Sequence, residues 1–375
     1  MTQAPPPEGM KLRRSSRDPR EVPDRLAAWL GTVLPPGADP VVAVRGGLDA
    51  NGLSSETLLV DITWSADGRR ELGRYVARVA PTPEDVPVFP TYAMRAQYDT
   101  IRIVGERSDV PVPGVRWLEP TGRVLGSPFF LMDRVEGVVP QDVLPYSFGD
   151  NWLFDATAEQ QRALQDRTVE VLATLHAIPD APTTFAFLDP DHPGGSALAR
   201  NLARTAAWYE FAAAGVGRSP LVERALAWLR SALPDPDETV LSWGDSRIGN
   251  VLYRDFAPVG VLDWEMATVG PRELDVSWLV FAHRVFESLS AMLGLPGMPD
   301  FLREDDVVAE YERLTGARLD DLTWYHVHNS ARWGIVFLRT GARQIHFGEI
   351  ERPDDVESLM HNRTLMEALL AEVGA

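Results

Sequence analysis

The chain has 375 residues, with 45% hydrophobic and 24% charged residues, as in an ordinary globular protein. Its length exceeds what one compact core serves, so two lobes or domains are expected. The formal charge of −18 argues against nucleic acid as a partner, because phosphate backbones are bound by clustered Lys and Arg. The absence of cysteine excludes disulfides, thiol catalysis and cysteine-ligated zinc.

Residues 1–23 are rich in proline and charge, which is typical of a mobile arm. No apolar stretch of signal-peptide length follows the basic residues, and no apolar run is long enough to span a bilayer. We therefore expect a cytoplasmic protein without a membrane partner. Lys11 in this arm is the only lysine of the chain, so any cation that the folded part uses must be arginine.

Short strand patterns dominate residues 24–135. A helix pattern over residues 24–34 precedes five strand-like runs, and a second helix pattern after Pro90, with Gln97 on its apolar face, separates the third run from the fourth. A Gly- and Ser-rich loop, residues 46–55, joins the first two runs. The runs cover residues 41–44, 57–64, 74–79, 114–119 and 128–135. We expect a small N-terminal lobe built on an antiparallel sheet.

Helix periodicity dominates residues 136–375. Thr157 and Gln160 form a capping-box pattern, and Ser219 followed by Pro220 marks another helix start. The chain is therefore predicted to be an α+β protein with a larger helical C-terminal lobe. The crevice between two such lobes is a common place for a ligand.

Two short apolar arms, residues 251–253 and 259–262, flank a turn at residues 254–258 and predict a β-hairpin. Antiparallel pairing sets Asn250, just before the first arm, beside Asp263, just after the second. Their amide and carboxylate oxygens are hard ligands that converge on one point. Mg²⁺ held by one or two protein oxygens and by substrate phosphates requires such an arrangement.

Asp245 lies five residues before Asn250, and the spacing D-x-x-x-x-N is that of a kinase catalytic loop. The stretch from Trp243-Gly244-Asp245 to Asn250, followed by Leu262-Asp263-Trp264-Glu265, resembles the H-G-D-x-x-x-x-N and I-D-W-E elements of the aminoglycoside phosphotransferase family. That family has the bilobal protein-kinase-like fold and includes choline, homoserine and macrolide kinases. The resemblance covers roughly residues 40–370 and outweighs the alternative that the two aspartates merely cap turns.

The resemblance implies ATP and Mg²⁺ as cofactors and assigns roles by position. Asp245 is then the catalytic base, and Asn250 and Asp263 are the magnesium ligands. Arg247 is expected to face the transferring phosphate and offset its charge, the alternative being a surface arginine on an exposed loop.

The nucleotide contacts follow from the same resemblance. The loop of residues 46–55 is expected to cover the phosphates with its backbone N–H groups and with the Ser54 and Ser55 hydroxyls. It lacks a clean G-x-G-x-x-G, so a plain surface hairpin remains the alternative. In the segment that resembles the hinge between lobes, the Asp133 carbonyl and the Val135 N–H are expected to bind the adenine edge.

Several positions depart from the family pattern. Arg78 stands where the family has a phosphate-clamping lysine, and a guanidinium can still grip phosphate oxygens bidentately. Gln97 aligns with the helix acid that pairs with that lysine, so it is either a partner of Arg78 or a plain core amide. Trp243 replaces a histidine that packs the catalytic loop. Asp275 matches an aspartate that braces this loop, and His176 is expected to be a core histidine.

The resemblance implies transfer of the ATP γ-phosphate to a hydroxyl of a small molecule, aminoglycoside-like or a hydroxylated metabolite or acyl compound. The D-W-E form resembles kinase-like domains found with acyl-CoA dehydrogenases as much as resistance kinases. The alternative function is a degenerate module that binds nucleotide without transferring it. Acceptor recognition is expected from the C-terminal lobe, either from an aromatic-rich stretch, residues 324–333, or from acids that a solvated helix would also carry. Those acids are Glu304, Asp305, Asp306, Glu310 and Glu312.

Overall fold

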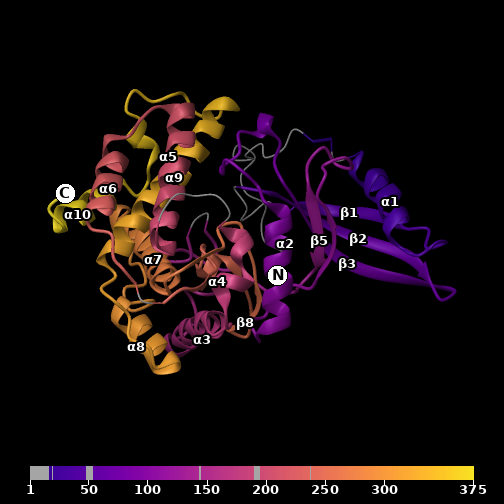
Figure 1. Cartoon of the computed structure of the whole chain (residues 1–375), viewed down its shortest axis with the longest axis horizontal. Coiled ribbons are helices and arrows are strands. Elements are labelled where there is room, and N and C mark those ends of the chain that lie inside the picture. Colours follow the sequence, from indigo (N-terminus) through magenta and orange to yellow (C-terminus); the bar gives the residue numbers. More distant parts are fainter. Residues whose placement is uncertain (1–16, 19, 48–53, 143–144, 190–194, 237) are drawn as a thin grey trace.

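The computed structural model describes residues 17–18, 20–47, 54–142, 145–189, 195–236 and 238–375. A sheet-containing N-terminal lobe and a larger helical C-terminal lobe lie side by side (Figure 1). The predicted α+β bilobal architecture is therefore confirmed. Most of the predicted mobile arm, and residues 48–53 of the predicted phosphate loop, lie outside the described residues.

The N-terminal lobe is built on a five-stranded antiparallel sheet with the order β1-β2-β3-β5-β4. Its strands are β1 (Val41–Gly47), β2 (Glu56–Ala66), β3 (Arg69–Val79), β4 (Val115–Glu119) and β5 (Phe129–Asp133). The five predicted runs are all strands. The third begins at Arg69 rather than at residue 74, because an exposed β2–β3 ribbon extends beyond the core and carries no apolar alternation.

Alternate residues of the central strands belong to two different cores, as the period of a strand requires. Ala77 and Leu131 pack against α1 (Val22–Val33) on one face of the sheet. Val76 and Phe130 face the other way and join the core that continues into the C-terminal lobe. The helix α2 (Met94–Arg107) and the short η1 (Pro83–Asp85) precede β4. The central strands of the sheet are thus buried on both faces and form a rigid wall of the cleft between the lobes.

The C-terminal lobe surrounds α9 (Thr323–His346), which packs against α5, α6, α7 and α10. The remaining elements are α3 (Ala158–His176), α4 (Ala181–Thr184), η2 (Ala186–Leu188), α5 (Ala197–Val216), α6 (Pro220–Ser231), β6 (Val240–Ser242), η3 (Ile248–Asn250), β7 (Val251–Arg254), β8 (Ala257–Val261), β9 (Thr268–Gly270), α7 (Glu273–Met292), α8 (Glu304–Thr315), η4 (Val356–Leu359) and α10 (Arg363–Glu372). Both predicted helix starts are confirmed. Thr157 and Gln160 exchange the two capping-box hydrogen bonds, and Ser219 caps α6.

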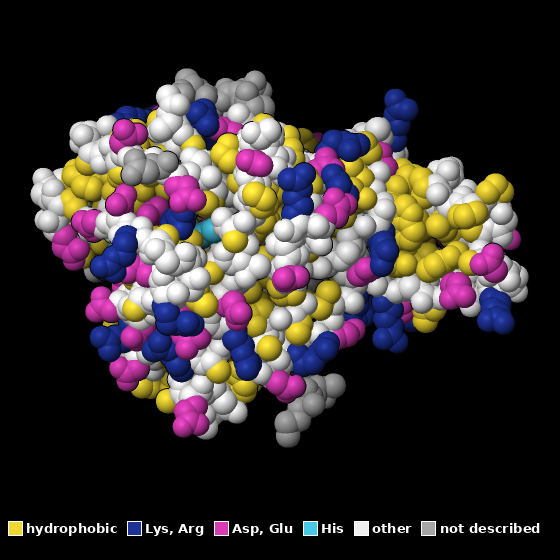
Figure 2. Space-filling model, turned by 60° about the horizontal axis from the view of Figure 1, so that its bottom comes forward, with side chains coloured by type: hydrophobic (Ala, Val, Ile, Leu, Met, Phe, Trp, Pro, Cys, Tyr) yellow, Lys and Arg dark blue, Asp and Glu magenta, His cyan; other side chains and the backbone are white. Residues whose placement is uncertain are grey.

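No helix in the described ranges combines the length and the apolar character that a bilayer crossing requires. On the face of the molecule shown in Figure 2, acidic and basic side chains are interspersed and do not form one acidic field. The acids of α8 follow this pattern, since Glu310 pairs with Arg313 and Glu312 with Arg318. Glu310 and Glu312 therefore behave as parts of a solvated helix surface, whereas Glu304 bonds to the buried His326 over 2.7 Å.

Candidate active site

The predicted hairpin is formed by β7 and β8, with Val251 opposite Val261. Its turn is tighter than the predicted residues 254–258, because Asp255 and Phe256 both adopt a positive φ, of 50° and 58°. Two consecutive residues of this kind form the compact turn that matches the twist of antiparallel strands. The end of the hairpin opposite the turn therefore lies at the catalytic loop.

Asn250 and the residues around Asp263 meet at this open end, as the sequence predicted. The Leu262 N–H donates to the Asn250 carbonyl over 2.9 Å. The Asn250 side-chain amide donates to the Asp245 carbonyl over 3.0 Å, so its Oδ1 is left as an acceptor. Asp263 has a φ of 57°, which turns the chain out of β8 at this point. One short segment of chain therefore brings all three predicted side chains together.

The Asp245 carboxylate is held by contacts that the sequence did not reveal. The indole N–H of Trp278, on α7, donates to Asp245 Oδ1 over 2.7 Å. Arg247 Nε donates to the same carboxylate over 3.0 Å and 3.2 Å, and its Nη1 pairs with Asp142. Arg247 is buried between these acids, so the alternative of an exposed surface arginine is wrong.

Asp275, at the start of α7, holds the backbone of the catalytic loop in place through hydrogen bonds. Its carboxylate accepts the N–H groups of Trp243 and Gly244 over 2.7 Å and 2.8 Å, and the Ser242 hydroxyl over 2.9 Å. His176 completes the set through Nε2 over 3.0 Å. Burial alone would raise the pKa of Asp275, but the bond from His176 and the backbone donors keep this pKa below its usual value. The predicted bracing role is confirmed.

His176 is a core residue, as expected, because its other nitrogen, Nδ1, lies 2.7 Å from the Tyr311 hydroxyl. Trp243 is fully buried and donates through Nε1 to the Leu262 carbonyl over 2.8 Å. The tryptophan therefore packs the loop in the place of the family histidine. Gly244 has a φ of 88°, and a Cβ at this position would collide with the Met266 carbonyl. Only glycine fits there.

Arg78 reaches the site from β3 and pairs with the carboxylate of Glu265, a residue of the D-W-E element. It also donates to Thr57 Oγ1 over 3.0 Å and lies 3.4 Å from Asp263. The Ser54 and Ser55 hydroxyls bond to the same Glu265 carboxylate. This one buried acid therefore connects the predicted phosphate-binding residues to the C-terminal lobe.

Of the two alternatives for Gln97, a hydrogen bond to Arg78 is not found among the described residues. The Gln97 amide instead donates to Met94 Sδ over 3.7 Å. Glu265 takes the place of a helix acid as the counter-ion of Arg78. The two residues are 187 positions apart in the chain, so helical periodicity could not identify this pair.

The electrostatics of the site fit a cation. Burial, reinforced by the charge of Glu265, raises the pKa of Asp263 to about 7, and Arg78 offsets this only in part. No cluster of three or more His, Asp or Glu side chains suited to a metal occurs within the described ranges. Mg²⁺ does not need one, because it is bound through one or two carboxylates together with substrate phosphates. Asp263 and the Asn250 amide oxygen are a donor set that suits this ion.

A cavity of about 260 Å³ lies between the lobes and is lined by three of the six predicted nucleotide-binding residues and by both predicted magnesium ligands. Ser54, Ser55 and Gln97 do not line it. Arg78 forms its wall on the N-terminal side, Asn250 and Asp263 lie on its floor, and Asp133 and Val135 lie at its hinge end. The Asp133 carboxylate points to Arg116, with contacts of 2.7 Å and 2.6 Å, so only its backbone is available to a ligand here.

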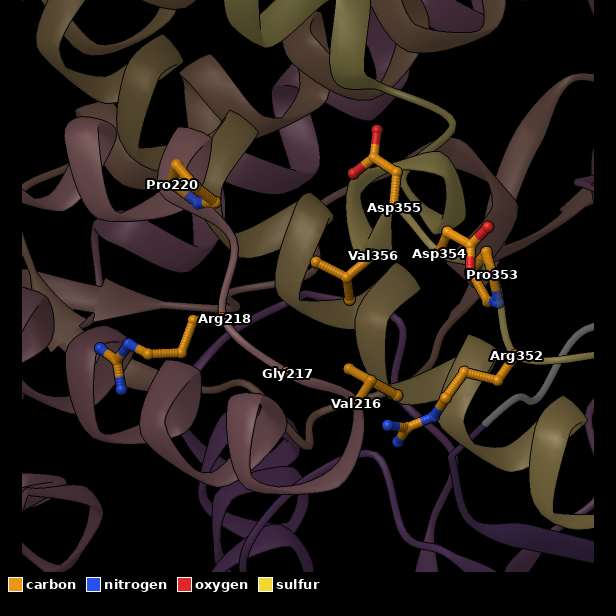
Figure 3. A pocket seen from close by; sticks show the side chains of 9 residues that line it. All are labelled: Val216, Gly217, Arg218, Pro220, Arg352, Pro353, Asp354, Asp355 and Val356. Atoms are coloured by element: carbon orange, nitrogen blue, oxygen red, sulfur yellow. The ribbon is translucent and has the colours of Figure 1, made fainter.

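A separate hollow between residues 216–220 and 352–356 is remote from this chemistry (Figure 3). Its charged groups already have partners: Arg352 donates to the Gly215 carbonyl, Arg218 pairs with Glu210, and Asp355 pairs with Arg363. We assign no role to this hollow.

A model of the phosphotransferase enzyme family matches residues 51–305 of the chain. Among curated proteins, "Probable acyl-CoA dehydrogenase IBR3" of Arabidopsis thaliana is 27% identical over 277 residues, which is 68% of this chain and 31% of that protein. "Acyl-CoA dehydrogenase family member 10" of Mus musculus is 27% identical over 206 residues, 52% of this chain and 18% of that protein. The chain thus spans a third or less of these relatives.

Solved structures show the same fold at low sequence identity. A candidate aminoglycoside phosphotransferase from Ralstonia eutropha is 20% identical, with a TM-score of 0.63 and coverage of 93% of this chain and 97% of that one. The macrolide 2'-phosphotransferase MphH from Brachybacterium faecium is 18% identical, with a TM-score of 0.52 and coverage of 90% and 98%.

The bracing of the loop by Asp275 predicts a large loss of stability for Asp275→Ala. Four donors then lose their acceptor in a buried site, which costs on the order of 3 kcal/mol of unfolding free energy. Chemical denaturation measures this change. Asp150→Ala removes an exposed acid and serves as the control, with an expected change within about 0.5 kcal/mol. Equal effects of the two substitutions would contradict the bracing role.

Proposed function

The chain belongs to the phosphotransferase enzyme family, and we propose that it moves the γ-phosphate of ATP to a hydroxyl of a small molecule. The observation that carries this proposal is that Asn250 and Asp263 line the cavity between the lobes and that the Asn250 side chain is bonded to the Asp245 carbonyl. These are the residue types, at the spacing, that phosphoryl transfer requires.

In this proposal ATP occupies the cleft cavity. The adenine edge meets the backbone of Asp133 and Val135 at the hinge end, and the phosphates lie towards Arg78 and the Ser54 and Ser55 hydroxyls. Asn250 and Asp263 hold Mg²⁺, which supplies charge neutralisation at the phosphates when bound. Gln97 is expected to act indirectly, as a buried amide on α2.

Asp245 accepts the proton of the acceptor hydroxyl as the new oxygen–phosphorus bond forms and ADP leaves. The Trp278 indole and the Arg247 guanidinium fix the direction of its carboxylate. Arg247 lies against this carboxylate and offsets negative charge that accumulates during transfer.

Glu265 gives Arg78 a counter-ion before nucleotide binds. We propose that phosphate oxygens compete for this guanidinium and for the two serine hydroxyls, which are all engaged with Glu265. A fork-shaped guanidinium can retain one carboxylate contact and still donate to phosphate.

The acceptor is proposed to be a hydroxylated compound, either aminoglycoside-like or a metabolite or acyl compound. The fold neighbours include aminoglycoside and macrolide phosphotransferases, whereas the curated relatives carry acyl-CoA dehydrogenase names. The second candidate, a module that binds nucleotide without transfer, is favoured by Arg78 and Gln97 at the family's Lys and acid positions. Phosphorylated product from any hydroxyl compound excludes it.

Asp245→Asn is expected to abolish transfer while nucleotide binding survives. The amide keeps the shape of the side chain but cannot accept the proton, so kcat should fall by about 10² to 10⁴. Product formation and Mg-ATP affinity are measured separately. Asp255→Asn, in the hairpin turn, is the matched control and should retain turnover. Full activity of Asp245→Asn would show that Asp245 is not the catalytic base.

Arg78→Ala is expected to raise the KM for ATP by about ten- to a hundred-fold, because a charge-assisted contact to phosphate is lost. Steady-state kinetics against ATP provide the measurement. Arg74→Ala removes an exposed arginine from the same strand and should leave the KM unchanged. An unchanged KM in both variants would mean that Arg78 does not contact the nucleotide.

A further inference from the structure

A second cavity, of about 310 Å³, lies on the other side of the Arg78–Glu265 pair from the cleft cavity. Arg78 lines the first cavity and Glu265 lines the second, so this ion pair forms part of the wall between them. The described residues around the second cavity are largely apolar. They include Phe89, Tyr92, Trp208, Trp264 and Met266.

The inner end of this second cavity reaches the catalytic loop through Arg332 of α9. Arg332 Nη2 donates to the Gly244 carbonyl over 2.9 Å, one residue before Asp245. Its guanidinium lies 4.3 Å from the ring centre of Trp278, the residue that holds the Asp245 carboxylate. Arg332 therefore connects the lining of this cavity to the loop and to the indole that hold the proposed base.

Arg332 is 6% exposed, and among the described residues no carboxylate forms an ion pair with it. A buried cation without a paired anion is costly, because the desolvation of its charge is not repaid. Burial lowers its pKa to about 10, and the attraction of Asp245 and Asp275 offsets this only in part. Arg332 is thus charged at neutral pH and short of negative charge.

A second arginine, Arg204 of α5, lines the same cavity. It donates to the Leu188 carbonyl over 2.8 Å and to the Thr268 hydroxyl. It also forms a long ion pair of 3.7 Å with Asp189, whose other carboxylate oxygen is bonded to Arg200. The positive charge of Arg204 contributes to the lowered pKa of Arg332 through repulsion.

The charges that line the second cavity therefore do not balance. Glu265 is the acid among its described lining residues, and that carboxylate is occupied by Arg78 and two serine hydroxyls. Arg332, which is buried, remains for a ligand in this cavity, and so does Arg204, whose side chain is 24% exposed and forms only a long ion pair of 3.7 Å with Asp189. A polycationic acceptor would be repelled here, whereas an oxyanion would restore balance.

We propose that this second cavity binds the phosphate acceptor and that the acceptor is an amphipathic hydroxy compound whose oxyanion, a carboxylate or a phosphate ester, is held by Arg332 and Arg204. The apolar walls take the body of the molecule, and Arg332 sets the anion beside the catalytic loop. This assignment rests on the proposed phosphotransfer and narrows its acceptor to an anionic class.

Calorimetry on the full chain without nucleotide tests the site directly. The probes are a medium-chain hydroxycarboxylic acid, its uncharged methyl ester, the amino alcohol of the same length, and the corresponding hydroxyalkyl phosphate. The acid or the phosphate should bind about ten- to a hundred-fold more tightly than the ester, because a charge-assisted contact is gained. Whichever of the two binds more tightly identifies the source of the oxyanion.

Arg204→Gln and Arg332→Gln should reduce the affinity for the anionic probe to that of the ester and leave the ester unaffected. Arg230→Gln is the control, since Arg230 is exposed on α6 and does not line the cavity. Should Arg332→Gln unfold, Arg332→Lys keeps the charge, and its retained preference for the anion supports the site.

Equal affinity for acid, phosphate and ester, or tightest binding of the amino alcohol, would overturn the assignment. Because the measurement needs no ATP, it separates the two proposals. Arginine-dependent binding of the anion with no phosphorylated product on addition of Mg-ATP supports this site and counts against phosphotransfer. Phosphorylation of cationic compounds alone supports phosphotransfer and counts against this site.

Discussion

The geometry of the site depends on one buried carboxylate. Asp275 accepts two consecutive backbone N–H groups, from Trp243 and Gly244, and this fixes the path of the chain into Asp245. A carboxylate with several charge-assisted donors is stable in a buried position, whereas the same group with fewer partners would be expensive. The positive φ of Gly244 and the close approach of Met266 complete the constraint. The side chains of Asp245, Asn250 and Asp263 are thereby held close together.

The scarcity of lysine has a structural consequence in the N-terminal lobe. Arginine at position 78 carries a longer, planar head group than the lysine it replaces, and it reaches across the cleft to Glu265. The neutral Gln97 of α2 is consequently not needed as its partner. Arg78 thus links the N-terminal lobe to the D-W-E element rather than to α2. The Ser54 and Ser55 hydroxyls bond to the same Glu265 carboxylate.

The two cavities differ in the chemistry of the residues that line them. The cleft cavity presents hard oxygen ligands and hinge backbone, which suit a nucleotide and its cation. The neighbouring cavity presents aromatic walls and undercompensated arginines, which suit a less polar molecule with a negative charge. Among the acids of α8, Glu310 and Glu312 pair with arginines, and Glu304 bonds to the buried His326. Most of the aromatic-rich stretch of α9 is buried in the core, but its Arg332 lines the neighbouring cavity.

The sequence by itself determined the two-lobed α+β fold, the capped helices and the triad of Asp245, Asn250 and Asp263. Each of these depends on residues close together in the chain, where period, capping pattern and hairpin register act directly. The tertiary structure decided the counter-ion of Arg78, the Trp278 contact to Asp245 and the placement of Arg204 and Arg332 at one cavity. The members of each pair are far apart in sequence, and their arrangement depends on packing angles that no local pattern encodes. The charge of the acceptor cavity could therefore be inferred only once the helices were placed.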